Sequence, residues 1–162
     1  MVRRVFFSFH YKKDVWRANQ IRNSWVTKDR EAAGFVDAAE FEKVEREGEA
    51  AVRRWIDKQL DGTSVTVVLI GTEVSTRPFV LYELEQSWKR GNGIVGIYIH
   101  KLKDKDGNTS AAGNNQFGAI FTSSNDNKKY FFERFSTYDW VDNDGYNNMG
   151  KWIEEAAKAA GR

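Results

Sequence analysis

Three short, nearly continuous apolar runs constrain the fold of this chain more than any other feature. They are RVFFSF from Arg4 to Phe9, SVTVVLI from Ser64 to Ile70 and IVGIYI from Ile94 to Ile99. Each run is rich in β-branched or aromatic residues and is bounded by turn residues, which is typical of β-strands. Because so few polar residues interrupt them, we expect both faces of each strand to be covered, as in a parallel sheet.

Helical patterns separate and follow these runs. We predict helices from Asp14 to about Val26, from Glu45 to Leu60, from Pro78 to Lys89 and from about Asn148 to Ala160. The apolar stripes, the early proline and the glycines just past the ends are typical helix signals. Strand and helix therefore alternate, as in right-handed βαβ units with helices on both sheet faces. The sequence predicts an α/β fold with a flavodoxin-like, doubly wound, mainly parallel five-stranded sheet.

Weaker patterns indicate the remaining strands. One short strand is predicted near Gly34 to Asp37 (GFVD), and another either in Tyr130 to Phe135 or in Thr137 to Val141. The stretch from Lys101 to Lys129 is rich in Asn, Gly, Ser and Asp, which indicates a long loop or insertion. The length of 162 residues is that of one ordinary domain, so we expect a single domain over residues 1–162.

Composition excludes several functional classes. With no Cys and only two His, the chain offers no disulfide, no Cys nucleophile and no histidine-based metal site, and we predict no metal and no cofactor. The amino-terminal apolar run is too short for a secretory signal, and no stretch approaches the roughly 18 apolar residues of a membrane span. The net charge of +2 without a long basic cluster argues against a nucleic-acid partner. A soluble, cytoplasmic protein is expected.

Candidate ligand-binding residues follow the predicted strands, because open α/β sheets bind ligands beyond the carboxyl ends of their strands. Ser8 and Phe9 end the first run and His10 follows it, Thr72 follows the second run and His100 follows the third. Ordinary roles remain open, since hydroxyls often cap turns and histidines often lie in solvated loops. No glycine-rich dinucleotide or phosphate-binding motif is present.

Glu83 is the most informative acidic residue. It lies about one turn inside a predicted helix that follows the polar segment from Gly71 to Thr76, near the carboxyl-end rim of the sheet. Two interpretations fit the pattern. Glu83 is either a functional carboxylate or, as expected for its neighbour Glu85, a solvent-facing glutamate near the positive end of the helix dipole.

Several segments carry a family resemblance. They are RVFFSFHYKKD from Arg4, RNSWVT from Arg22, TSVTVVLIG from Thr63, RPFVLYELEQSWKRGNGIVGIYIH from Arg77 and YDWVDNDGYNNMGKWI from Tyr138. In this order they resemble the TIR-like domains of bacterial anti-phage defence, most closely the small TIR proteins of Thoeris systems. The resemblance leaves out residues 101–129.

The resemblance implies a specific chemistry. TIR enzymes carry a catalytic glutamate in the pattern Trp-Cys-x-x-Glu, and the stretch from Phe79 to Glu83 has this form, with Phe in place of Trp and Val in place of Cys. Such enzymes break the bond between nicotinamide and ribose in NAD⁺, which is their substrate and not a cofactor. Thoeris-like members convert the ADP-ribose into a cyclic or conjugated messenger that activates a separate effector protein. The resemblance therefore implies a catalytic role for Glu83.

The resemblance also implies a nucleotide cleft at the end of the first strand. Phe6, Ser8, Phe9 and His10 would line it, with Phe9 facing a base and Ser8 a ribose or phosphate. Since successive side chains of a strand point to opposite faces, at least one of Phe6 and Phe7 must belong to the core.

Further substrate contacts are expected from Thr72, Phe79, Arg22 and Asn23. The charge of Arg22 suits the pyrophosphate, but pairing with a surface carboxylate is an equal alternative.

A non-catalytic TIR module that acts by self-association or by docking to a partner stays open, because Phe79 departs from the enzymes' Trp. A phosphorylation receiver domain would need clustered acidic residues after the first strand, where this chain has Ser8, Phe9 and His10. The acidic stretch from Asp139 to Asn147 lacks the spacing of a calcium-binding EF-hand, and a capped turn before the last helix explains it better.

Overall fold

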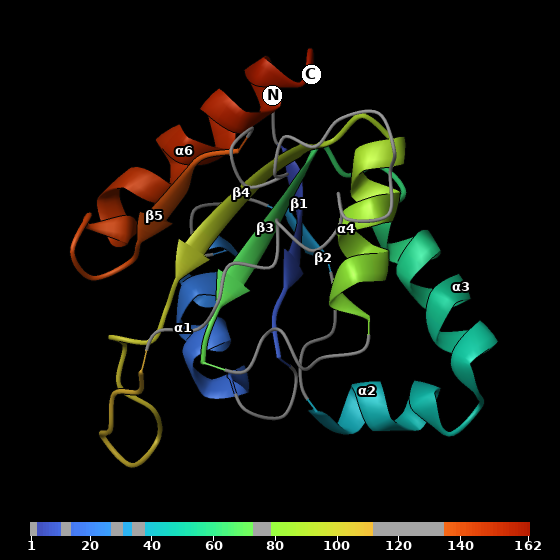
Figure 1. Ribbon diagram of the computed structural model, residues 1–162, viewed down its shortest axis with the longest axis horizontal. Coiled ribbons are helices and arrows are strands. Elements are labelled where there is room, and N and C mark those ends of the chain that lie inside the picture. The colour runs from blue at the N-terminus through green and yellow to red at the C-terminus, as the bar shows by residue number, and fades with distance from the viewer. Residues whose placement is uncertain (1–2, 11–13, 27–30, 34–37, 73–78, 112–134) are drawn as a thin grey trace.

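The computed structural model describes residues 3–10, 14–26, 31–33, 38–72, 79–111 and 135–162. Strands and helices alternate along the described chain, as Figure 1 shows. The strands are β1 (Arg4–Ser8), β2 (Glu31–Ala33), β3 (Val65–Ile70), β4 (Gly93–Tyr98) and β5 (Thr137–Asp139). The helices are α1 (Val15–Val26), α2 (Ala38–Glu45), α3 (Glu49–Leu60), α4 (Val80–Lys89) and α6 (Gly145–Ala159).

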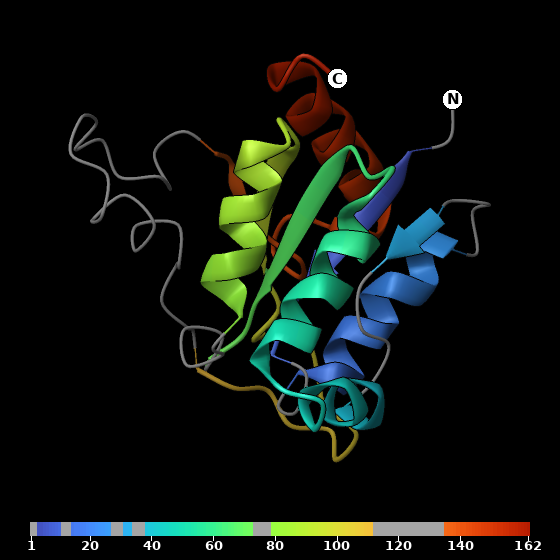
Figure 2. The same ribbon diagram turned by 90° about the vertical axis from the view of Figure 1, so that its right-hand side faces the viewer.

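The strands form a parallel sheet in the order β2-β1-β3-β4-β5. Helices α1 and α6 pack together on one face, and α4 lies on the other face beside α3 (Figure 2). The predicted α/β architecture with a parallel sheet and helices on both faces is therefore confirmed. None of the described helices is long and apolar enough to cross a bilayer.

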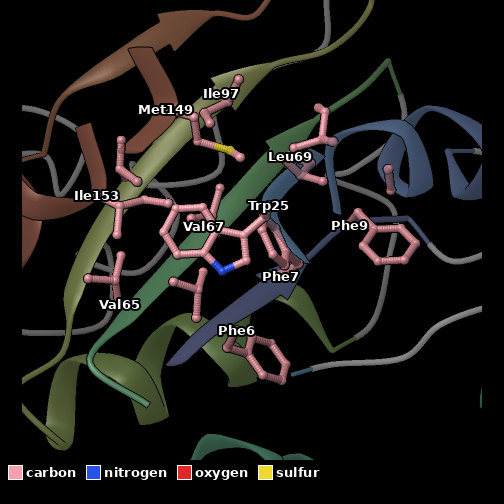
Figure 3. Close-up of a cluster of buried hydrophobic side chains, with 14 of the residues drawn as sticks. Phe6, Phe7, Phe9, Trp25, Val65, Val67, Leu69, Ile97, Met149 and Ile153 are labelled. Atoms are coloured by element: carbon pink, nitrogen blue, oxygen red, sulfur yellow. The ribbon is translucent and has the colours of Figure 1, made fainter. Parts of the chain in front are cut away.

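The central strand β3 is buried along its whole length, which explains its unbroken apolar sequence. Its alternate residues Val65, Val67 and Leu69 belong to one cluster with Trp25 of α1 and with Met149 and Ile153 of α6 (Figure 3). Val68 and Ile70 belong instead to a cluster with Val80 and Leu84 of α4. The sheet is thus a layer between two apolar helical surfaces, and α4 is held against it by its own apolar stripe.

The predicted helix from Glu45 to Leu60 is wrong at its start. Residue Gly48 has a φ of +105° and separates α2, which ends at Glu45, from α3, which begins at Glu49. That backbone conformation is accessible to glycine and strained for other residues, so the helix cannot run through it. Helix α2 was not predicted, and the last helix begins at Gly145, three residues before the predicted start.

Other expectations are partly tested. The second strand is β2, just before the predicted stretch 34–37, which lies outside the described residues. Of the two alternatives for the last strand, the one in Thr137 to Val141 is confirmed by β5, and residues 130–134 lie outside the described chain. Residues 101–111 form no helix or strand, in agreement with the predicted loop, and its remainder is not described. The predicted helix start at Pro78 also lies outside the described residues, and α4 begins at Val80.

Candidate functional site

Glu83 lies in the first turn of α4 and is fully buried, with 0% of its surface exposed. Because a crossover helix between parallel strands runs back along the sheet, the first turn of α4 lies at the carboxyl-end rim. Glu85, two residues later, is exposed, and its carboxylate lies 3.0 Å from the Lys89 ammonium. Of the two interpretations of Glu83, a solvent-facing carboxylate is therefore excluded. Burying a carboxylate is costly, so its position requires compensating structure.

Ser8 and Phe6 lie on the same sheet face as α4. In the β1–β3 register Phe6 is opposite Thr66 and Ser8 is opposite Val68. The Thr66 hydroxyl contacts Ser87 of α4, which identifies that face. Both Ser8 and Phe6 are 0% exposed. The end of β1 therefore presents its hydroxyl on the side of the sheet where Glu83 is carried.

Phe7 and Phe9 belong to the large core cluster, and each is at most 1% exposed. Figure 3 shows both rings among the buried apolar side chains. Phe9, which we expected to face a base, thus has no open face in this structure. His10 is only partly buried, and its backbone carbonyl accepts a hydrogen bond from the Asp14 N–H at 2.9 Å.

Phe79 anchors the beginning of α4. Its ring is 7% exposed and meets the Phe41 ring of α2 edge-on, with 6.3 Å between the ring centroids. The Glu83 N–H donates to the Phe79 carbonyl at 2.9 Å, so the two residues share the first turn of the helix. The aromatic lead-in therefore sets where the helix that carries Glu83 starts.

Arg22 and Asn23 lie on α1, across the sheet from α4 (Figure 2). Asn23 is exposed, so the structure does not bring it together with Glu83. Arg22 is partly buried, and that burial lowers the pKa of its guanidinium, while the nearby Glu40 carboxylate of α2 acts in the opposite direction. The Glu40 carboxylate is thus one electrostatic neighbour of Arg22.

Thr72 is exposed just beyond the end of β3. Its hydroxyl donates to the backbone carbonyl of Ala111. The His100 carbonyl accepts the Ser110 N–H at 2.9 Å. The segment after β4 therefore returns to the carboxyl ends of β3 and β4 and forms part of the rim.

A buried ion pair that the sequence did not reveal supports this rim. Asp14 and Arg17 are 3% and 5% exposed. A guanidinium nitrogen of Arg17 lies 3.5 Å from a carboxylate oxygen of Asp14. The Arg17 guanidinium also donates to the backbone carbonyls of Leu102 at 2.8 Å and Asn108 at 2.9 Å. The Asp14 carboxylate packs so closely on Gly71 that a Cβ there would lie 2.1 Å from Oδ2. An acid and a base three residues apart on a helix usually mark its surface, so no sequence signal indicated this burial.

Helix α3 braces the outer side of α4. The Tyr82 hydroxyl donates to the Asp57 carboxylate at 2.8 Å, and the Arg53 guanidinium lies 5.2 Å from the centre of the Tyr82 ring. Arg90 donates to the Asp57 carbonyl at 3.0 Å and to the Asp61 carboxylate at 2.6 Å. Burial and, to a smaller extent, the bond to Asp57 raise the pKa of Tyr82 to about 12.

A cavity of about 660 Å³ lies at the opposite end of the sheet from Glu83. It is bounded by the start of β4, the end of α4 and the end of α6, and its lining includes Trp88, Gly93, Phe135, Tyr138, Trp152 and Ala160. Its position separates it from the residues at the carboxyl-end rim.

A comparison with protein families shows which family this chain belongs to. Residues 6–104 match the model described as the Thoeris protein ThsB, TIR-like domain. The chain belongs to this family. The resemblance seen in the sequence is thereby confirmed, and the region of the ThsB match contains the end of β1 and all of β3, α4 and β4, with Glu83 and the buried Asp14–Arg17 pair.

A curated relative extends the similarity beyond that region. This ThsB-family chain is 35% identical to a Bacillus cereus (strain MSX-D12) protein named "Putative cyclic ADP-D-ribose synthase ThsB1". The alignment of 191 residues covers 94% of this chain and 100% of the relative. The two proteins are therefore related over almost their whole lengths, which extends the similarity beyond residues 6–104.

Proposed function

We propose that this ThsB-family protein breaks the nicotinamide–ribose bond of NAD⁺ and converts the ADP-ribose part into a cyclic or conjugated messenger. That messenger would activate a separate anti-phage effector. The observation that carries the proposal is the complete burial of Glu83 in the first turn of α4, at the carboxyl-end rim of the sheet. The cyclic ADP-D-ribose synthase name of the Bacillus cereus relative supports the same substrate and product class.

The chemistry fits a buried carboxylate. Nicotinamide leaves with the electron pair of the C–N bond, and the ribose carbon is left with oxocarbenium character. A carboxylate close to that carbon stabilises the positive charge, more strongly in a site that excludes water than in solvent. This role requires the ionised form of Glu83.

Substrate access requires a rearrangement. Since Glu83 has no exposed surface, NAD⁺ reaches its carboxylate only after neighbouring groups move. Closure of the site around the nucleotide then excludes water from the reacting carbon. Ser8, at the end of β1, and His10 and Thr72, which follow β1 and β3, are candidates along the rim for contacts with the ribose or phosphates.

The fate of the ribose carbon determines the product. Attack by water gives ADP-ribose, whereas attack by a nucleophile within the same ADP-ribose gives a cyclic product that is one water lighter. Attack by a separate acceptor gives a conjugate. Each route releases nicotinamide, so the mass of the second product distinguishes them.

The test is incubation of the purified protein with NAD⁺, alone and with lysate from phage-infected cells, followed by chromatography and mass spectrometry. Glu83→Gln serves as the inactive comparison. We expect nicotinamide and a cyclic or conjugated ADP-ribose product from the wild type only. Folded wild-type protein that turns over no NAD⁺ under either condition contradicts the proposal and favours the docking module.

A further inference from the structure

Two buried hydroxyl groups connect α4 to β3 directly behind Glu83. The Ser87 hydroxyl donates to the Glu83 backbone carbonyl at 2.7 Å, and the hydroxyls of Ser87 and Thr66 lie 2.6 Å apart. All three residues are 0% exposed. Because Ser87 uses its proton toward Glu83, the Thr66 hydroxyl is the donor in the second bond. The resulting chain runs from the strand through both hydroxyls to the peptide group of Glu83.

Packing alone does not favour these residue types. A serine inside a helix forms that helix less readily than alanine or leucine, and a buried hydroxyl gains little beyond what it loses by leaving water. The surrounding cluster is apolar, with Val68, Leu84 and Ile94 among its members. An apolar residue at either position would fill the same space without needing a partner. The hydroxyl pair therefore calls for an explanation other than core packing.

We propose that Thr66 and Ser87 are positioning residues for Glu83, an inference that rests on the proposed function. The Glu83 carbonyl accepts the Ser87 hydroxyl in addition to its place in the helical hydrogen-bond ladder. This second bond fixes the peptide plane next to the Glu83 Cα. It also ties that plane to the middle of β3, whose register sets the place of Ser8 at the end of β1.

The consequence for catalysis is a fixed depth and direction of the Glu83 side chain. Small displacements of a catalytic group cost rate much more than they cost binding, because the transition state needs closer alignment than the bound substrate. Loss of either hydroxyl should therefore lower kcat and leave KM nearly unchanged. A purely structural role would instead lower the stability and the activity together.

The experiment compares Thr66→Val, which replaces the hydroxyl by a methyl group of similar size, with Thr66→Ser, which keeps the hydroxyl. Ser87→Ala removes the second hydroxyl. Ser24→Ala is the matched control, since the Ser24 hydroxyl makes the same kind of bond to the Ile21 carbonyl, at 2.7 Å, on α1 across the sheet. Nicotinamide release from NAD⁺ gives kcat and KM, and circular dichroism gives Tm.

We expect Thr66→Val and Ser87→Ala each to lower kcat about tenfold or more with KM within about twofold of wild type. Thr66→Ser should keep most of the wild-type kcat. The double variant Thr66→Val with Ser87→Ala should lose little more kcat than either single variant, because both changes break the same chain of hydrogen bonds. A Thr66→Val variant with the kcat of the wild type would overturn the positioning role, and so would a Thr66→Ser variant that loses as much kcat as Thr66→Val. Either result would leave the proposed function standing as long as the wild-type protein turns over NAD⁺. Absence of turnover in the wild type would overturn both.

Discussion

At the residue scale, Tyr82 has a titration that the structure makes specific. Its pKa is about 12, above the ordinary value of about 10, because burial and the bond to Asp57 favour the neutral phenol. A raised folded-state pKa contributes stability that is fully present below pH 10 and is lost as the pH rises toward 12. The bond between α4 and α3 should therefore weaken in strongly alkaline solution.

Tyr82→Phe tests this titration. The variant should lose about 1 kcal/mol of unfolding free energy at neutral pH, because the hydrogen bond is absent. Between pH 10 and 12 its unfolding free energy should fall less steeply than that of the wild type. Urea unfolding at several pH values measures both effects, with Tyr146→Phe, at an exposed ring, as the control. If the unfolding free energies of the wild type and Tyr82→Phe fell in parallel with pH, Tyr82 would not be the group whose titration lowers the stability.

Arg17 provides a second residue-scale prediction. Arg17→Met leaves the Asp14 carboxylate buried without this cation and removes the donors to the Leu102 and Asn108 carbonyls. We expect a loss of about 3 to 5 kcal/mol of unfolding free energy. The exposed pair of Lys151 and Glu155, 3.9 Å apart, supplies the control, since Lys151→Met should cost less than about 1 kcal/mol.

A double-mutant cycle separates the ion pair from the carbonyl contacts. Asp14→Asn combined with Arg17→Met should cost clearly less than the sum of the two single changes, because the unpaired buried charge is then gone. Chemical denaturation of the four proteins gives the coupling. Strictly additive costs would mean that Arg17 acts through the carbonyls alone.

At the element scale, the contact between α6 and β4 depends on a glycine at position 93, which has no side chain. A Cβ at Gly93 would lie 2.4 Å from the Ala156 backbone carbonyl oxygen, so the helix would have to move. Gly93→Ala should lower the unfolding free energy by about 1 to 3 kcal/mol. It should also change the near-ultraviolet circular dichroism. The rings of Tyr138 of β5 and Trp152 of α6 are stacked with 4.2 Å between their centroids, so a shift of α6 would disturb this stack.

Gly107→Ala is the comparison for this prediction. Gly107 has a φ of +80° and open space around it, so alanine there adds backbone strain but no collision. This variant should lose stability and keep the wild-type near-ultraviolet spectrum. A wild-type spectrum in Gly93→Ala would contradict the close helix–strand contact.

The same scale shows which elements the sequence could predict. The strands β1, β3 and β4 were predicted within one residue at each end, because strands buried on both faces have an unbroken apolar composition. Helix α2 is short, half of its eight residues are charged (AAEFEKVE), and Phe41 is its one fully described core residue, so its periodicity gave little signal. The break at Gly48 depends on a single backbone conformation, which neighbouring helix-forming residues conceal.

At the scale of the whole molecule, the sheet brings together residues that are far apart in the sequence. The family pattern indicated Glu83, but its complete burial depends on how α4 packs against α3, β3 and β4. Ser87, Thr66 and Asp57 could not be predicted from the sequence, because an isolated hydroxyl or carboxylate has the same appearance on a surface and in a core. The arrangement of the elements, which pairs these groups, distinguishes the two.

The family relationship and the structure support each other at this scale. The ThsB match spans residues 6–104, which include the rim residues after β1 and β3 and the helix that carries Glu83. The central claim is that Glu83 stabilises the reacting ribose and does more than support the fold. A test of this claim must separate the chemical step from substrate binding and from folding.

The most direct test is the rate of nicotinamide release from NAD⁺ by the wild type, Glu83→Gln and Glu85→Gln, with Tm and NAD⁺ affinity measured on the same samples. Glu85 is the matched control because it is an exposed carboxylate on the same helix. We predict that Glu83→Gln stays folded, binds NAD⁺ and loses about a hundredfold or more in kcat, whereas Glu85→Gln retains the wild-type rate. An active, folded Glu83→Gln variant, or an equal loss in both variants, would contradict the account.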